Sequence, residues 1–220
     1  PRLPAGLNFA SHIFLREQQN PALFSQATAI LTYPQYWAWR LSGTRASEVS
    51  YLGCHSHLWA PLQDGFSSLA TGRGWAKSFP PLVRAGAIIG QHGELAIHNG
   101  VHDSNAVLYF YRSLGFKDFT LLSTGTWVIG FNPALALEKL DQTRDMLANV
   151  SVDHQPVATA RFMGGREYDV ISGSSRIHVT LEMIEHVIAR RQMALPSFAE
   201  GGPFPGHKGC WQGPAAEGEA

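Results

Sequence analysis

Apolar residues recur with helical spacing near the start of the chain. In LNFASHIFLREQQ, Leu7, Ala10 and Phe14 fall on one face of a helix, and Phe9 and Ile13 lie four apart beside it. The pattern stops at Asn20-Pro21, where a proline ends the periodic run. It predicts a first helix with one buried face.

Proline and glycine mark a second helix. Pro34 opens PQYWAWRL and Gly43 follows it, so a helix is predicted between them. The apolar run 29–31 before it predicts a short strand. Residues 47–61 lack helical spacing and predict an irregular or strand-containing segment, and residues 65–78 predict one or two short helices.

A strand, a polar loop and a helix follow. Residues 87–90 and LAIH predict a strand that ends in a loop. Asp103 and Ser104 are N-cap candidates for a helix over residues 105–114. This layout is found in active sites and is also a common connection.

Two hairpins are predicted next. The first has β-rich arms at 119–122 and 127–131 around the turn Ser123-Thr124-Gly125-Thr126. The second has arms at 146–153 and 157–163. Helices over about 165–171 and 180–191 then precede a Gly- and Pro-rich segment after Pro196, which predicts a loop.

Composition narrows the class of protein. With 220 residues, 45% hydrophobic and 15% charged, the chain is expected to be globular. Seventeen basic residues balance seventeen acidic ones, which favours neither nucleic acid nor a membrane surface as a partner. The longest apolar runs fall short of the roughly 18 residues of a membrane span, so a soluble protein is expected.

The two cysteines, Cys54 and Cys210, lie far apart and form no CxxC pair, which argues against a disulfide scaffold or a cysteine zinc site. A reducing, cytoplasmic location fits this pattern.

Several common catalytic motifs are missing from the sequence: GxxxxGK[ST], GxGxxG, GxSxG and HExxH. One metal-ligand set is present, in GCHSHLW and in the pair of histidines that follows it. It comprises Cys54, His55, His57, His98 and His102. A metal-dependent hydrolase built on this set is one open alternative.

Two short polar segments suit other chemistry. In HDSNA, a carboxylate at a strand-to-helix loop would accept a proton from a polar substrate, while an aspartate there also fits a helix cap. In STGTW, a turn of small residues exposes backbone amides that suit phosphate oxygens, although many such turns bind nothing.

Four segments, taken in order, resemble the FGGY family of carbohydrate kinases, in particular its fuculokinase- and xylulokinase-like members. They are TAILTYPQYWAWRLSG, GVHDSNA, LLSTGTW and RFMGGREYD. The resemblance implies an α/β fold of the actin-like ATPase (ribonuclease H-like) architecture, with parts of two domains around a cleft. Residues 1–117 would end the sugar-binding domain, and residues 118–220 would begin the nucleotide-binding domain.

The resemblance also implies roles for individual residues. Asp103 would be the general base, and His102, Ser104 and Asn105 would contact the sugar. The phosphate-binding residues would be Ser123, Thr124, Gly125 and Thr126. The reaction would transfer a phosphoryl group from ATP, with Mg²⁺, to a ketose or polyol hydroxyl. No residue here is assigned as a metal ligand, and a homodimer is compatible with the family.

Two motifs of the family are missing from these residues. Neither its amino-terminal DxGT phosphate turn nor its glycine-rich adenosine motif is present. The chain is therefore expected to be a fragment that is inactive alone. A non-catalytic relative that binds a sugar or a nucleotide is the second open alternative, and the identity of the sugar stays unassigned.

Overall fold

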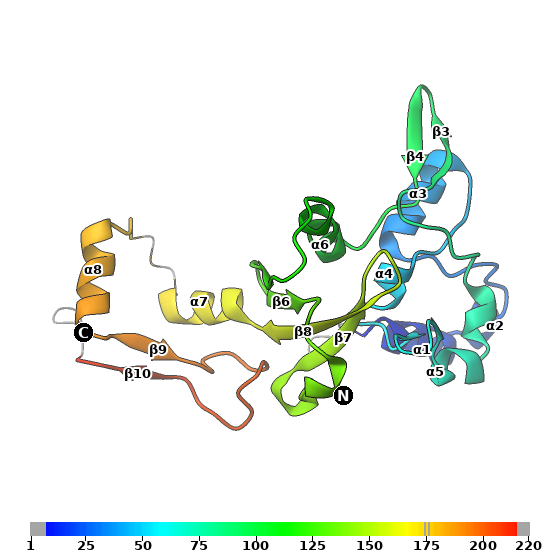
Figure 1. The fold of residues 1–220 in the computed structure, drawn as a ribbon. Coiled ribbons are helices and arrows are strands. Elements are labelled where there is room, and N and C mark those ends of the chain that lie inside the picture. Colours follow the sequence, from blue (N-terminus) through cyan, green and yellow to red (C-terminus); the bar gives the residue numbers. More distant parts are fainter. Residues whose placement is uncertain (1–7, 174, 176, 215–220) are drawn as a thin grey trace. The chain divides into compact units, whose positions relative to one another are not determined.

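The structure is a computed structural model that describes residues 8–173, 175 and 177–214. It divides into two compact units. Unit 1 consists of Pro1–Leu121, Phe131–Leu140 and Leu147–Thr159, and unit 2 of Leu122–Gly130, Asp141–Met146 and Ala160–Ala220. Figure 1 shows the elements of both units.

The described residues form both helices and strands. The α-helices are α1 Phe9–Gln19, α2 Pro21–Phe24, α3 Tyr33–Ser42, α4 Val49–Leu52, α5 Ser68–Gly72, α6 Asp103–Ser113, α7 Gly164–Ser172 and α8 Leu181–Ala189. Short 3-10 helices are η2 Trp75–Ser78, η3 Leu137–Lys139 and η4 Gln142–Arg144. The strands are β1 Trp59–Ala60, β2 Gly65–Phe66, β3 Ile88–His92, β4 Leu95–His98, β5 Leu121–Ser123, β6 Val128–Asn132, β7 Met146–Val150, β8 Pro156–Phe162, β9 Met193–Leu195 and β10 Cys210–Gln212.

Helix α1 forms where the periodicity predicts it, and Ala10 of the predicted face is buried together with Ile13 beside it. The Asn8 side chain caps the helix by accepting a hydrogen bond from the Ala10 amide at 3.1 Å. Ala10 and Ile13 are buried, whereas Phe14 is 45% exposed. Leu7 lies outside the described residues. The predicted face is therefore wrong at Phe14.

Helix α3 confirms the boundaries that proline and glycine predict. A proline lies in its first turn, and Gly43 ends it with φ of 77°. The apolar run before it is no strand in the structure. Ile30 instead packs against the core of unit 1 from a loop, which explains why an apolar run needed no strand partner.

The single strand predicted near residues 87–98 is an antiparallel hairpin, β3–β4. It lies beside α3 in unit 1 (Figure 1). The contact is close at Gly90, where an added Cβ would lie 2.7 Å from the Ser42 Cβ. A glycine at this position therefore lets the hairpin approach the end of α3.

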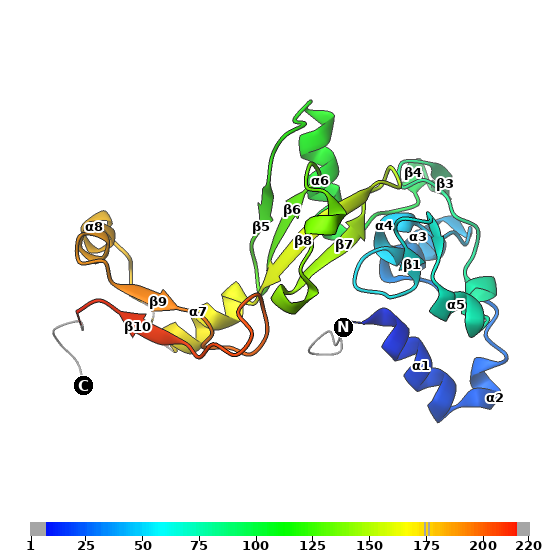
Figure 2. The same cartoon turned by 60° about the horizontal axis from the view of Figure 1, so that its bottom comes forward.

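Both predicted hairpins appear in one four-stranded sheet with the order β5-β6-β8-β7 (Figure 2). The helices predicted near 165–171 and 180–191 are also confirmed, as α7 and α8. The segment after Pro196 is not wholly a loop, because β10 pairs there with β9, with Trp211 opposite Ala194.

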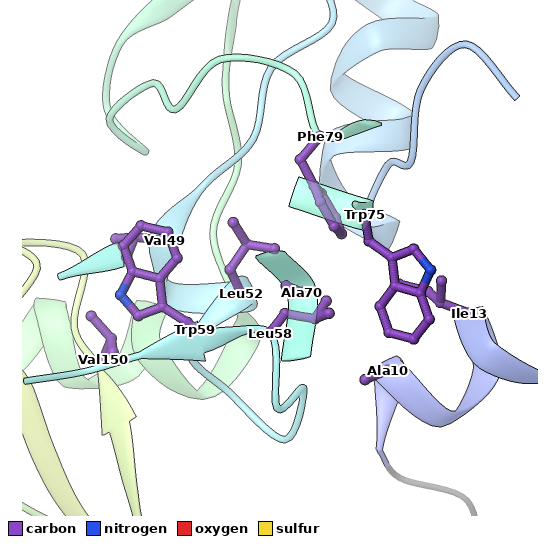
Figure 3. Packing of buried hydrophobic residues seen from close by; sticks show 10 residues of the cluster. All are labelled: Ala10, Ile13, Val49, Leu52, Leu58, Trp59, Ala70, Trp75, Phe79 and Val150. Carbon is purple, nitrogen blue, oxygen red and sulfur yellow. The ribbon is translucent and has the colours of Figure 1, made fainter. Parts of the chain in front are cut away.

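The core of unit 1 gathers apolar side chains from distant parts of the chain (Figure 3). They are Ala10, Ile13, Val49, Leu52, Leu58, Trp59, Ala70, Trp75, Phe79 and Val150. Gly53, at the end of α4, meets Val150 of β7 so closely that an added Cβ would lie 2.5 Å from the Val150 Cγ2. The strand and the short helix are thus in direct contact.

A buried polar network holds the loop between β4 and α6. Gln35 of α3 donates through Nε2 to the Asn99 carbonyl at 2.9 Å. Asn99 donates through Nδ2 to the Ser47 carbonyl at 2.9 Å and to the Val83 carbonyl at 2.7 Å. Gln35 is 1% and Asn99 0% exposed, so water does not compete for these bonds. Four segments of unit 1 are joined in this way.

The last helix of the described part keeps its apolar face in solvent. Leu181 and Ile188 of α8 are 71% and 69% exposed, and none of the helix's residues is buried.

Within residues 8–173, 175 and 177–214, no helix has both the length and the apolar character that crossing a membrane requires.

The buried network predicts a specific loss of stability. Gln35→Leu should lower the free energy of unfolding by about 1–3 kcal/mol, because the Asn99 carbonyl would lose its buried donor. Leucine and glutamine have similar helix propensities. Gln18→Leu, at an exposed position of α1, is therefore the matched control, with an effect within about 0.5 kcal/mol. Urea unfolding of the protein that contains this chain measures both, and equal effects would contradict the network's role.

Candidate active site

Asp103 is the first residue of α6, and its side chain is 92% exposed. Its Oδ1 accepts a hydrogen bond from the Ser104 amide at 2.6 Å and lies 3.3 Å from the Ser104 hydroxyl. The N-cap position belongs to His102, which makes no side-chain cap bond, so the prediction of Asp103 or Ser104 as the N-cap is wrong. The carboxylate faces solvent, where a substrate hydroxyl can reach it.

His102 is packed beside this carboxylate. Its side chain is 12% exposed, and its ring lies 5.3 Å from the Tyr51 ring and 5.8 Å from the His55 ring. Nδ1 lies 3.1 Å from the Asp103 Oδ1 without the alignment of a hydrogen bond. Burial lowers the pKa of His102, and the negative charge of Asp103 opposes this only in part. At neutral pH the imidazole is therefore neutral.

A second carboxylate, that of Glu48, is linked to the start of α6 through Ser50. The His102 amide donates to the Ser50 Oγ at 3.2 Å, and the Ser50 hydroxyl donates to Glu48 Oε2 at 2.5 Å. Glu48 is 1% exposed, and burial raises its pKa despite the hydrogen bonds that it accepts from Ser50 and Tyr51. Glu48 thus positions backbone and does not reach solvent.

The two residues after Asp103 differ in exposure. Ser104 is half-buried beside the carboxylate, whereas Asn105 is 1% exposed. Both polar atoms of the Asn105 side chain lack a hydrogen-bond partner among the described residues. Leaving such an amide unpaired costs about 1–3 kcal/mol. Asn105 therefore has capacity for a polar partner such as a water molecule or a ligand.

The polar turn predicted to bind phosphate lies in unit 2. Ser123 ends β5, and Thr124, Gly125 and Thr126 are exposed. Gly125 does not have left-handed backbone, and an added Cβ there would meet only the Trp127 carbonyl oxygen, at 3.8 Å. The turn's own glycine is therefore not required by local sterics, and a side chain at that position has room.

The glycine that the turn does require comes from α7. The Gly165 amide donates to the Thr126 carbonyl at 3.2 Å. An added Cβ at Gly165 would lie 2.5 Å from the Gly125 oxygen and 2.7 Å from the Thr126 Cα. Because both atoms belong to the backbone, they cannot move aside cheaply. The RFMGGREYD segment thus lies directly against the polar turn.

Sequence reasoning assigned no role to Arg161, which lies in the same segment. Arg161 is 2% exposed and pairs with Asp145. Its guanidinium carbon lies 5.4 Å from the centre of the Trp127 ring, directly after the turn. Arginine stacks well on such a ring. Arg161 and Asp145 are sixteen positions apart in sequence, so no local pattern predicts their ion pair.

The five residues of the metal-hydrolase alternative do not form one site. His57 Nδ1 contacts the Asn8 side chain, and His98 Nδ1 donates to the Gly86 carbonyl at 2.7 Å. The described residues bring the other three together, namely Cys54, His55 and His102, with ligand atoms within 4.8 Å of one another.

Comparison with known proteins identifies the family. Residues 116–220 match the profile of the C-terminal domain of FGGY carbohydrate kinases. The crystal structure of a carbohydrate kinase from Novosphingobium aromaticivorans is 37% identical, with a TM-score of 0.81 over 96% of this chain. The chain belongs to the FGGY family of carbohydrate kinases. No curated protein matches it.

The fold of this FGGY chain agrees with that assignment. A xylulose kinase from Rhodospirillum rubrum matches with a TM-score of 0.65 at 13% identity over 96% of the chain, and one from Lactobacillus acidophilus with 0.65 at 14% over 94%. The mixed helix and sheet architecture is part of the actin-like ATPase fold, as the sequence predicts. The FGGY chain covers 52%, 47% and 46% of these three structures, about half of each.

Gly165 offers a test of how this FGGY chain builds the polar turn. Gly165→Ala should lower the free energy of unfolding by about 1–3 kcal/mol, because the new methyl group overpacks against backbone. Gly72→Ala is the control, since Gly72 also lies in a helix but has open space around its Cβ direction. Thermal unfolding compares the two. A Gly165→Ala protein as stable as the Gly72→Ala protein would contradict the close contact.

Proposed function

We propose that the protein containing this chain transfers the γ-phosphoryl group of ATP to a hydroxyl of a ketose or polyol. The observation that carries the proposal is Asp103, an exposed carboxylate at the first position of α6 in a chain 37% identical to a carbohydrate kinase. A carboxylate that water and substrate can reach, fixed on a rigid helix, suits a general base.

The chemistry asked of Asp103 is a single proton transfer. Bound ATP supplies the phosphoryl group. As the sugar oxygen forms its new bond to phosphorus, its proton passes to the Asp103 carboxylate, and ADP is the leaving group. A positioned base contributes about 10² to 10⁴-fold to the rate if it comes within about 3 Å of the hydroxyl. Ser104 and the unpaired amide of Asn105 are the proposed contacts to other hydroxyls.

His102 is proposed to shape the same site. As a neutral imidazole packed behind the carboxylate, it limits the positions open to Asp103 and adds no charge of its own. Its side chain is 12% exposed, and its proposed contact to the substrate is through one edge of the ring.

The turn of Ser123, Thr124, Gly125 and Thr126 is the proposed phosphate contact. Its residues are exposed apart from the half-buried Ser123, and it offers hydroxyls and backbone amides without a bulky side chain, which fits phosphate oxygens. Mg²⁺ prefers oxygen ligands. The described residues provide one metal-ligand triad, of sulfur and nitrogen donors, so the Mg²⁺ of the reaction would be bound through the phosphates.

Three further proposals concern the whole protein. Residues 1–117 belong to the sugar-binding domain and residues 118–220 to the nucleotide-binding domain. The chain alone is inactive, because it covers about half of the structures that it matches. The working protein acts in the cytoplasm on a small sugar, and a homodimer is compatible with this function.

Replacing the proposed base gives the direct test. Asp103→Asn in the full-length protein should lower kcat by about 10² to 10⁴-fold, because the amide cannot accept the proton. ATP affinity should stay within about twofold, since Asp103 acts on the acceptor. Steady-state kinetics over a panel of ketoses and polyols, beside calorimetry with ATP, measures both quantities.

Asp118→Asn is the matched control for this experiment, because Asp118 is an exposed aspartate outside the proposed site. It should keep wild-type turnover. If Asp103→Asn also kept it, Asp103 would not be the base. If wild-type protein bound sugar and ATP without transferring phosphate, the non-catalytic alternative would hold instead.

The polar turn predicts a different kinetic pattern. Thr126→Ala should lower kcat more than it weakens nucleotide binding, because its hydroxyl is proposed to meet the transferred phosphate. Ser25→Ala, at an exposed position of unit 1, is the control. A Thr126→Ala protein with unchanged kcat and unchanged ATP affinity would remove this turn from the site.

A further inference from the structure

Three potential metal ligands meet where α4 ends and α6 begins. Cys54 and His55 follow α4, and His102 is the N-cap residue of α6. Their ligand atoms, one from each side chain, all lie within 4.8 Å of one another. Cys54 is buried, whereas both histidines are half-buried, so the cluster can be reached from solvent on one side.

We propose that Cys54, His55 and His102 bind a divalent cation of the zinc class, with a water molecule as the fourth ligand. One thiolate and two imidazoles suit this class, since soft and borderline donors select such ions over Mg²⁺ or Ca²⁺. The site is distinct from the Mg²⁺ that accompanies ATP in phosphoryl transfer, which needs oxygen ligands.

The spacing is close to what a tetrahedral ion needs. With metal–ligand bonds of about 2.0 to 2.3 Å, the ligand atoms of such a site lie about 3.3 to 3.8 Å apart. An outer separation of 4.8 Å therefore leaves about 1 Å of side-chain adjustment. Rotation of the half-buried histidines supplies such an adjustment more easily than movement of the buried cysteine.

One feature of His102 supports the proposal independently of the spacing. The Nδ1 atom of His102 is buried and has no hydrogen-bond partner among the described residues, an arrangement that costs free energy unless a ligand or water completes it. His55 has φ of 50°, in the left-handed region that non-glycine residues seldom occupy.

Binding would exchange a proton for the metal. The Cys54 thiol loses its S–H proton to solvent as the sulfur–metal bond forms, and the histidines bind as neutral imidazoles. No electron is transferred. A bound ion would join the end of α4 to the start of α6. In sequence, 47 residues lie between Cys54 and His102.

Cobalt provides the test, because a thiolate ligand gives Co²⁺ a charge-transfer band in the near ultraviolet. The full-length protein should bind one equivalent of Co²⁺ with this band, and Zn²⁺ should displace it. Cys54→Ser should abolish the band, and Cys210→Ser, at the exposed second cysteine, should retain it. The titration needs neither sugar nor ATP, so its result is independent of the kinase proposal.

A second pair of variants covers the case in which Cys54→Ser fails to fold. His55→Asn removes the imidazole while asparagine tolerates the left-handed backbone, and metal affinity should fall at least about tenfold. His57→Asn is the matched control, with φ of 57° and a side chain outside the cluster. Wild-type protein without the thiolate band, or equal losses in His55→Asn and His57→Asn, would overturn the proposal.

Discussion

The hydrogen bonds of two buried amides, Gln35 and Asn99, are the constraint on which the described part of unit 1 depends. Gln35 donates to the Asn99 carbonyl, and Asn99 donates to the carbonyls of Ser47 and Val83. Apolar packing is tolerant of small shifts, whereas a buried amide has few positions in which all its partners are met. These bonds tie the loop before α6 to α3 and to the backbone at Ser47 and Val83, while the Asp103 side chain that follows is in solvent.

Two carboxylates near the start of α6 show how burial divides their tasks. Glu48 is enclosed, carries a raised pKa and binds Ser50 and the Tyr51 amide. Asp103, at the other side of His102, is open to solvent. The enclosed acid is held by hydrogen bonds from its neighbours, whereas the open one is accessible to solutes, so the proposed base is the less constrained of the pair.

Local signals in the sequence were sufficient for the longer helices and for the two hairpins of the four-stranded sheet, but they predicted the β3–β4 hairpin as a single strand. Pro34 and Gly43 bound α3, and small polar turns separate the paired strands. Local signals could not reveal the partners of Gln35 or Arg161. Gln35 binds a carbonyl 64 positions further along the chain, and Arg161 pairs with Asp145, 16 positions before it. The same limit explains β10, whose three residues form a strand only because β9 lies alongside. For the candidate site, the motifs located Asp103 and the polar turn, but not the buried contacts that hold them.

The contact between Gly53 and Val150 has a consequence for the history of the family. A methyl group at position 53 would overlap the Val150 side chain, while the backbone of Gly53 is not left-handed and would itself accept other residues. The obstacle is thus a side chain that evolution can shorten. An added Cβ at position 53 would lie 2.6 Å from the Val150 Cβ itself, so only glycine at position 150 removes the overlap. Homologous sequences with alanine or serine at position 53 should therefore carry glycine at position 150, and the two positions should covary across ninety-seven residues of separation.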